Sequence, residues 1–307
     1  MPAAEPQLLD PAVLARISDL ELVARTVVDG FLAGLHRSPH LGVSTDFAEH
    51  RQYAPGDDVR RVDWKLYART DRHFVKEFEA ETNASVGVLL DVSASMGYGS
   101  GAVRKLDYAR ILAACLLYFS QRQRDRIALS TFDADVVEHV PPSTRHLPQA
   151  LHALGRATAG KPGDPSVRSG QAIPAALRRL AESYRRRGVL VVVSDLYVEP
   201  DALVTALHAL RGPGSEIVVM HVLDPAELDF PFEEPAAFRD MEGDDALPVL
   251  PPAARERYRA LIGGHVATLR RRLGEAAMDY FLFDTRRPLD AALHEYLSVR
   301  ERLARTR

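Results

Sequence analysis

Two apolar runs that each end in an acidic residue constrain the fold of this chain most strongly. Residues 87–91 and 188–195 are rich in Val and Leu and are short. Runs of this kind are typical of strands that are buried on both faces of a parallel sheet. The first run ends in Asp91 and the second in Asp195. If the two strands are neighbours, both carboxylates should meet in the crevice at the carboxyl edge of the sheet.

The residues after the first run add hydroxyl groups to this crevice. Ser93 and Ser95 follow Asp91 at alternate positions, and alternate residues of an extended chain point the same way. Carboxylate and hydroxyl oxygens are the donors that a hard divalent cation such as Mg²⁺ prefers. The alternative is a structural turn, in which Asp91 caps the next helix and the serines bond the backbone.

Helices and strands alternate from residue 86 onward, which predicts an α/β fold with a doubly wound, mostly parallel sheet. The expected strands 127–132 and 136–140 are joined by three residues, so we expect one antiparallel edge strand. Further strands are expected at 216–223 and 279–284. Helices are expected at 103–121, 146–154, 173–187, 201–211, 253–273 and 288–302.

Two other segments differ in character from this alternating pattern. Residues 1–83 are predicted to form an appended N-terminal arm, with helical spacing over 10–34 and a strand over 73–79. Residues 84–307 then form the α/β domain. Within that domain, residues 225–252 mix eight acids with six prolines, which predicts a solvated surface loop or a short hairpin. A partner-contact insertion is the alternative for this stretch.

Composition excludes several classes of protein. The net charge is −3 and the pI is about 6.4, so nothing favours binding to nucleic acid or to anionic lipid. Cys115 is the one cysteine, which excludes a disulfide framework within one chain. No apolar run approaches the ~20 residues that a membrane span needs. The chain is therefore expected to be soluble and cytoplasmic.

Enzyme motifs are incomplete in this sequence. Residues 155–162 match the spacing of a phosphate-binding loop, but Pro162 replaces the Ser or Thr that would hold Mg²⁺. No Gly-x-Ser-x-Gly elbow surrounds Ser93 or Ser95. A phosphohydrolase that uses Asp91 as nucleophile would need a second acid two residues later, and that residue is Ser93.

The Asp91-x-Ser93-x-Ser95 string resembles the metal-ion-dependent adhesion site of von Willebrand factor A domains. Residues 47–81, above all the stretch 51–64, resemble the signature of the bacterial domain-of-unknown-function family 58. This resemblance implies a six-stranded sheet with an antiparallel edge strand and a metal crevice at the carboxyl ends. It also implies a partner, because family members are commonly encoded beside MoxR-type AAA+ ATPases and are thought to act with them in assembly or chaperone-like activity.

The resemblance assigns metal-site roles by position. Asp91, Ser93 and Ser95 match the first metal loop, and Asp195 matches the third, where the acid usually holds the ion through water. Gln171 stands where the family pattern has a threonine in the second loop, and its longer side chain would alter the geometry that Mg²⁺ requires. Mg²⁺ or Mn²⁺ is the expected ion.

A partner-binding segment is predicted in the family signature. A Pro-Gly turn at 55–56 precedes a short helix of mixed charge that carries the one tryptophan of the chain. The simpler interpretation is a capped turn with no binding role. The candidate contact residues are Tyr53, Asp57, Asp58, Arg60, Asp63 and Trp64.

Three functional hypotheses follow. The first is a non-enzymatic, metal-dependent adaptor that accepts a partner's Asp or Glu and works with a MoxR-type ATPase and a client protein. The second is an interaction protein of the same fold whose metal site is degenerate. The third is a metal-dependent phosphohydrolase that uses Asp91.

Overall fold

The structure is a computed structural model that describes residues 10–37, 50–52, 67, 74–76, 85–160, 172–184, 187–243 and 245–305. The chain divides into two compact units. One unit comprises Met1–Leu32 and Ala84–Arg307, and the other comprises Ala33–Asn83. In the smaller unit, strands β1 (His50–Gln52) and β2 (Phe74–Lys76) pair antiparallel.

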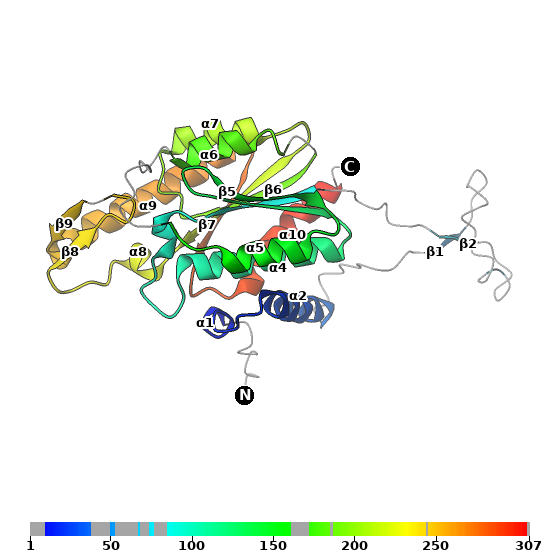
Figure 1. Cartoon of the computed structure of the whole chain (residues 1–307), viewed down its shortest axis with the longest axis horizontal. Helices are drawn as coiled ribbons and strands as arrows, with labels where there is room; N and C mark the ends of the chain where they lie inside the picture. The colour runs from blue at the N-terminus through cyan, green and yellow to red at the C-terminus, as the bar shows by residue number, and fades with distance from the viewer. Residues whose placement is uncertain are drawn as a thin grey trace. The chain divides into compact units, whose positions relative to one another are not determined.

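The described part of the larger unit is built on a six-stranded sheet with the strand order β10-β7-β6-β3-β4-β5 (Figure 1). Neighbouring strands run parallel, except that β5 pairs antiparallel with β4 at one edge. The predicted mostly parallel sheet with one antiparallel edge strand is therefore confirmed. The strands are β3 (Ser85–Asp91), β4 (Arg126–Phe132), β5 (Val136–Ser143), β6 (Gly188–Ser194), β7 (Glu216–Leu223) and β10 (Asp279–Asp284).

Helices cover both faces of this sheet, as Figure 1 shows. One face carries α6 (Ala172–Leu180), α7 (Pro200–Leu210) and α9 (Pro251–Glu275). The other carries α4 (Lys105–Arg122), α5 (Leu147–Arg156) and α10 (Leu289–Arg305). Because both faces are covered, the inner strands are buried, and every residue of β3 after Ser85 is buried. The edge strand β5 still has exposed residues such as Val137.

Short helices precede this domain in the chain and belong to the same unit up to Leu32. Helix α1 (Pro11–Leu14) begins at Asp10, whose carboxylate accepts a hydrogen bond from the Ala12 amide at 2.8 Å. Helix α2 (Leu20–Arg37) buries Val23 and Val27 completely. Its Phe31 ring meets His294 of α10 edge to face, with ring centroids 6.3 Å apart. These contacts attach α2 to the domain that follows.

The pairing of β3 with β6 determines where the site lies. Their parallel register runs from Ser85 opposite Gly188 to Leu90 opposite Val193. The next residues, Asp91 and Ser194, therefore leave the sheet side by side at the carboxyl ends of the two central strands. This is the convergence that the two apolar runs predict.

Residues 225–252 contain a short helix and a two-stranded hairpin, and neither is part of the six-stranded sheet. Helix α8 (Pro225–Asp229) begins with a capping box, in which Asp224 and Glu227 bond each other's backbone amides. Strands β8 (Ala236–Arg239) and β9 (Ala246–Val249) then form an antiparallel hairpin. Of the two predicted forms, a surface loop or a short hairpin, the structure shows the hairpin, and α8 adds a helical turn before it. Across the described residues, no helix is both long and apolar enough to span a membrane.

Candidate functional site

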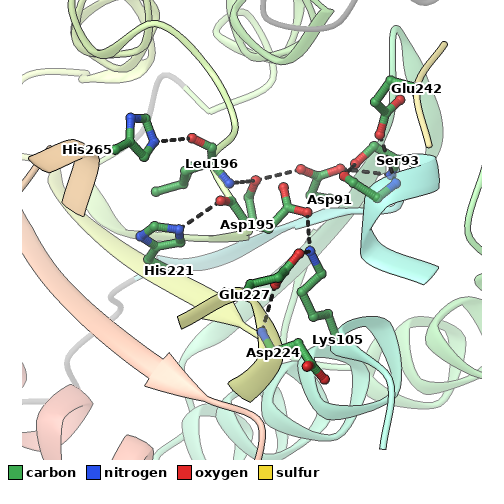
Figure 2. Close-up of polar contacts among 12 residues, drawn as sticks. Asp91, Ser93, Lys105, Asp195, Leu196, His221, Asp224, Glu227, Glu242 and His265 are labelled. Carbon is green, nitrogen blue, oxygen red and sulfur yellow. Dashed lines mark hydrogen bonds and ion pairs between the residues drawn. The ribbon is translucent and has the colours of Figure 1, made fainter. Parts of the chain in front are cut away.

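Asp91 ends β3 with its carboxylate fully buried. One oxygen, Oδ1, accepts a hydrogen bond from the Ser93 amide at 2.8 Å. The other oxygen, Oδ2, accepts one from the Ser194 hydroxyl at the tip of β6, at 2.5 Å (Figure 2). Asp91 thus fixes the first amide of the turn and joins the two strand tips. It does not cap the next helix, because the N-cap residue of the 3-10 helix that follows is Ser93, which makes no side-chain capping hydrogen bond.

The surroundings of Asp91 disfavour its charged form. Burial and then the nearby Asp195 carboxylate raise the pKa of Asp91 to about 7, although hydrogen bonds from Ser194 and Ser93 act in the opposite direction. Ser194, which bonds Asp91, directly precedes Asp195 in the chain, so the two predicted acids lie in one site. A cation placed between them would relieve this repulsion.

Ser93 and Ser95 stand beside the Asp91 carboxylate, at the start of the short helix η3 (Ala94–Gly97). Their hydroxyl oxygens are 3.2 Å apart, which places two neutral oxygen donors next to the buried acid. The Ser95 amide donates a 2.8 Å hydrogen bond to Glu242, which belongs to the turn between β8 and β9 (Figure 2). A carboxylate from a distant part of the chain therefore already reaches this loop.

Asp195 follows β6 and is only 1% exposed. Its Oδ2 accepts a 2.8 Å hydrogen bond from the Lys105 ammonium, while its Oδ1 has no hydrogen-bond partner among the described residues. Buried carboxylate oxygens are normally satisfied. The bare Oδ1 is thus an acceptor that a bound water or cation would complete.

The backbone around Asp195 is held in place by its neighbours. Leu196 adopts a left-handed conformation with φ of 51°, and its amide bonds the Ser194 hydroxyl at 3.0 Å. His221 Nε2 donates to the Asp195 carbonyl at 2.7 Å, and burial lowers the pKa of His221 to about 3, so the ring is neutral. His265 Nε2 donates to the Leu196 carbonyl at 2.9 Å. These contacts fix the backbone of residues 194–196 and therefore the direction of the Asp195 side chain.

Lys105 supplies a buried positive charge to the site. Its side chain has no exposed surface, and its ammonium also binds Glu227 of α8 at 2.6 Å. The rings of Tyr98 and Tyr197 lie 5.9 and 5.2 Å from the ammonium. Burial opposes the charged form, but the carboxylates of Asp195 and Glu227 outweigh it, and the pKa of Lys105 is raised. The lysine therefore stays charged.

A cleft of about 320 Å³ opens over these groups. Its floor is polar and contains Ser93, Ser95 and Asp195. Its aromatic lining comes from the segments after η3 and β6, from the segment after α8, from β8 and from α9. The aromatic lining residues are Tyr98, Tyr197, Phe230, Phe232, Phe238 and Tyr258.

Comparison with known proteins assigns the chain to a family. The family model described as "Protein of unknown function DUF58" matches residues 49–268, which is most of the chain. The chain belongs to this family. The predicted membership is confirmed, and the sheet has the strand arrangement that the resemblance to a von Willebrand factor A domain implies.

Relatives of this DUF58 protein include uncharacterised proteins of Mycobacterium bovis and Mycobacterium tuberculosis. These proteins are 28% identical over 95% of this chain and 91% of their own length. Similar solved structures include an aerotolerance-related membrane protein from Bacteroides fragilis (18% identity, 72% of this chain, 99% of that chain, TM-score 0.47). The VWA domain of SpRpn10 is also similar (11% identity, 68% of this chain, 93% of that chain, TM-score 0.37).

The predicted metal residues of this DUF58 chain are partly brought together. Asp91, Ser93, Ser95 and Asp195 gather in one notch, through the contacts given above. Gln171 lies outside the described residues, and so do all the predicted partner-binding residues. Those residues are Tyr53, Asp57, Asp58, Arg60, Asp63 and Trp64.

Three residues of the site escape prediction from the sequence. Lys105 stands in the first turn of α4. A cation is unfavourable there because of the helix dipole, so a lysine at this position indicates that an acid lies close to it. Glu227 is the third residue after the Asp224 cap, a recognisable capping-box pattern. Glu242 carries no local signal, because it meets Ser95 across 147 residues.

The notch fits a hard divalent cation by the chemistry of its donors. Its oxygens are the Asp91 carboxylate, the hydroxyls of Ser93 and Ser95, and the free Oδ1 of Asp195. No cluster of three His, Cys, Asp or Glu side chains suited to a metal occurs within the part of the chain that the structure describes. An ion here would therefore depend on the serine hydroxyls.

Proposed function

We propose that this chain is a non-enzymatic, protein-binding adaptor whose notch holds Mg²⁺ or Mn²⁺ and, through the ion, a carboxylate of a partner protein. The unpartnered Oδ1 of Asp195, buried beside the Asp91 carboxylate and two serine hydroxyls, is the observation that carries this proposal. Asp91, Ser93 and Ser95 would hold the ion directly, and Asp195 through water. The ion would supply the positive charge that an anionic partner group requires.

The chain's own residues prepare the notch for this role. Lys105 neutralises one oxygen of Asp195 and leaves the other free. Ser194 bonds Asp91 and is itself bonded by the Leu196 amide, so both strand tips keep one arrangement. Such preorganised carboxylates lose little conformational freedom when an ion binds.

The resemblance extends this proposal to partners and location. The partner would be a MoxR-type AAA+ ATPase acting on a client protein in the cytoplasm, with no role for nucleic acid or membrane insertion. Purification of the tagged chain from its own cells, with and without a chelator, tests this part. An ATPase that is retained only without chelator supports the proposal, and no ATPase under either condition contradicts it.

Thermal unfolding tests the metal site. An ion at about 100 times its Kd adds about 2.7 kcal/mol to the free energy of unfolding, and each kcal/mol raises Tm by about 2–4 °C in a domain of this size. We expect saturating Mg²⁺ or Mn²⁺ to raise Tm by about 5–10 °C. Asp91→Ala should abolish this rise.

Asp284→Ala provides the matched control for that experiment. Asp284 also ends a strand, but β10 is separated from β3 by β7 and β6. This variant should keep the full rise in Tm on addition of the ion. Equal responses of the two variants would contradict the proposed ligand set.

A second candidate function is an interaction protein of the same fold that needs no ion. Lys105 favours it, because its ammonium already places a positive charge against Asp195 and Glu227. The thermal experiment separates the two candidates. No rise in Tm with either ion would favour the metal-free version.

A further inference from the structure

The turn of the β8–β9 hairpin reaches the proposed metal loop. Glu242 Oε1 accepts a 2.8 Å hydrogen bond from the Ser95 amide, and Figure 2 shows its carboxylate directed at the loop beside Ser93. The Glu242 amide in turn bonds Asp240 Oδ1 at 3.0 Å, which holds the shape of the turn. Met241, the residue before Glu242, lines the cleft. The turn therefore presents an apolar residue and an acid to the notch together.

Glu242 occupies a cleft that already contains other acids. Asp133 and Asp195 line the same cleft as Glu242. Nearby carboxylates repel one another, so an anion in this cleft gains from any positive charge beside it and loses from each further acid. A partner's carboxylate that binds together with a cation therefore competes well with the Glu242 contact.

The hairpin is lightly attached to the rest of the domain. Six of the eight residues in β8 and β9 are exposed, and only Phe238 and Val249 are half-buried. Phe238 stacks on Phe230 at 5.4 Å between ring centroids, and Phe230 stacks on Tyr258 at 4.5 Å. Because little apolar surface is buried by the strands themselves, displacing the hairpin costs little hydrophobic free energy.

We propose that Glu242 is an internal substitute for a partner's carboxylate, and that a partner segment with an acidic residue directly after a bulky apolar residue binds by displacing the hairpin turn. This inference rests on the proposed function, since it names the partner chemistry of the same notch. The Met241–Glu242 pair is the pattern on which this partner is based. Glu242 accepts a hydrogen bond from the Ser95 amide, and the Met241 side chain lines the cleft beside the aromatic residues.

A peptide copy of the hairpin, residues 236–249 with a fluorescent label, is the probe for this proposal. In the wild-type chain the tethered Glu242 competes at a high effective concentration, so the peptide should bind weakly. In Glu242→Ala the tethered competitor is removed, and we expect at least about tenfold tighter binding. Peptides that carry Gln in place of this Glu, or Ser in place of the preceding Met, should lose most of this gain.

Hydrogen exchange provides a second measurement on the protein alone. The Ser95 amide should exchange faster in Glu242→Ala and Glu242→Gln, because its acceptor is weakened or lost. Glu234→Gln is the matched control, since Glu234 is an exposed acid of the same segment. It should leave both the Ser95 exchange rate and the peptide affinity at wild-type values. An unchanged circular dichroism spectrum and Tm would verify that each variant folds.

The outcomes separate this proposal from the proposed function. If Glu242→Ala binds the peptide no more tightly than wild type, the internal-substitute proposal is overturned, even where Mn²⁺ still raises Tm. If Glu242→Ala gains peptide binding equally in Mn²⁺ and in chelator, and Tm does not respond to the ion, the substitute stands and the metal role fails. A gain that appears only with Mn²⁺ supports both.

Discussion

Lys105 and Asp91 show that single buried charges dominate this site. Lys105 has no exposed surface and neutralises carboxylates from β6 and α8. Asp91 is equally buried, but the groups that shift its pKa are hydrogen-bond donors and another acid, with no cation among them. The Lys105 charge is compensated within the chain, whereas the raised pKa of Asp91 lets its carboxyl group keep a proton below about pH 7. We therefore expect substitution of Lys105 to lower stability and substitution of Asp91 to change its pH dependence.

Lys105→Met should destabilise the protein strongly. Met preserves the length of the buried stem but leaves Asp195 and Glu227 without their cation, which typically costs about 3–5 kcal/mol. Urea unfolding would measure this loss. Arg179→Met is the control, because the Arg179–Asp135 ion pair is exposed and solvent screens it, so its loss should change stability little. Equal losses in the two variants would contradict a structural role for the buried pair.

Asp91→Asn should flatten the pH dependence of stability in chelator. The pKa of Asp91 is about 7 in the folded chain and about 3.9 in an unfolded one. The folded state therefore holds a proton that the unfolded state releases, and stability falls as pH rises from about 4 to about 7. The slope attributable to Asp91 is about 1.4 kcal/mol per pH unit.

Urea unfolding of wild type and Asp91→Asn at several pH values would measure this effect, because other groups cancel in the difference. The wild-type chain should lose stability relative to the variant up to about pH 7 and then run parallel to it. Parallel curves over the whole range would show that Asp91 is ionised in the folded protein.

Two glycines of strands β3 and β6 leave no room for a side chain. Gly188 stands opposite Ser85 in the register, and a Cβ at Gly188 would lie 2.0 Å from the Ser85 backbone oxygen. A Cβ at Gly87 would lie 2.5 Å from the Tyr184 ring. Glycine at these two positions therefore permits the close approach of β6 to β3 and of Tyr184 to β3.

Gly188→Ala should therefore destabilise the sheet by about 1–3 kcal/mol or more, because the neighbouring backbone cannot move aside as a side chain can. Denaturant unfolding provides the measurement. Gly263→Ala is the contrasting variant, since Gly263 lies inside α9 with no atom within 4 Å of an added Cβ. Alanine there should raise stability by up to about 1 kcal/mol. Stabilisation by Gly188→Ala would show that the strands have room to separate.

The whole molecule combines a conventional α/β sheet with an accessory hairpin that reaches back to the sheet edge. The sheet places Asp91 and Ser194 side by side through the parallel β3–β6 pairing. The segment after β7 then supplies α8, with Glu227 against Lys105, and the hairpin, with Glu242 against Ser95. The notch is thus assembled from one end of the sheet and one insertion, to which the insertion contributes Glu227 and Glu242.

The sequence by itself determined the strands, their buried character and the acids at their ends. A local pattern predicts each strand, because an apolar run that ends in Asp91 or Asp195 can be recognised within about ten residues. The pairing of the two strands was a condition of the prediction, and the structure meets it. Parallel α/β sheets bring the carboxyl ends of neighbouring strands to one edge. Asp91, Ser93, Ser95 and Asp195 were therefore predictable as one group, and the edge strand and hairpin were as well.

Only the tertiary structure decided which distant residues contact Asp195 and the Ser95 loop. Lys105 meets Asp195 across 90 residues and Glu242 meets Ser95 across 147, and no local pattern encodes contacts at such separations. Their free energy comes from burial and from low-dielectric electrostatics, which exist only after the chain has folded. For this reason the carboxylate and hydroxyl oxygens of the notch could be predicted from the sequence, while its charge balance and the contact of Glu242 could not.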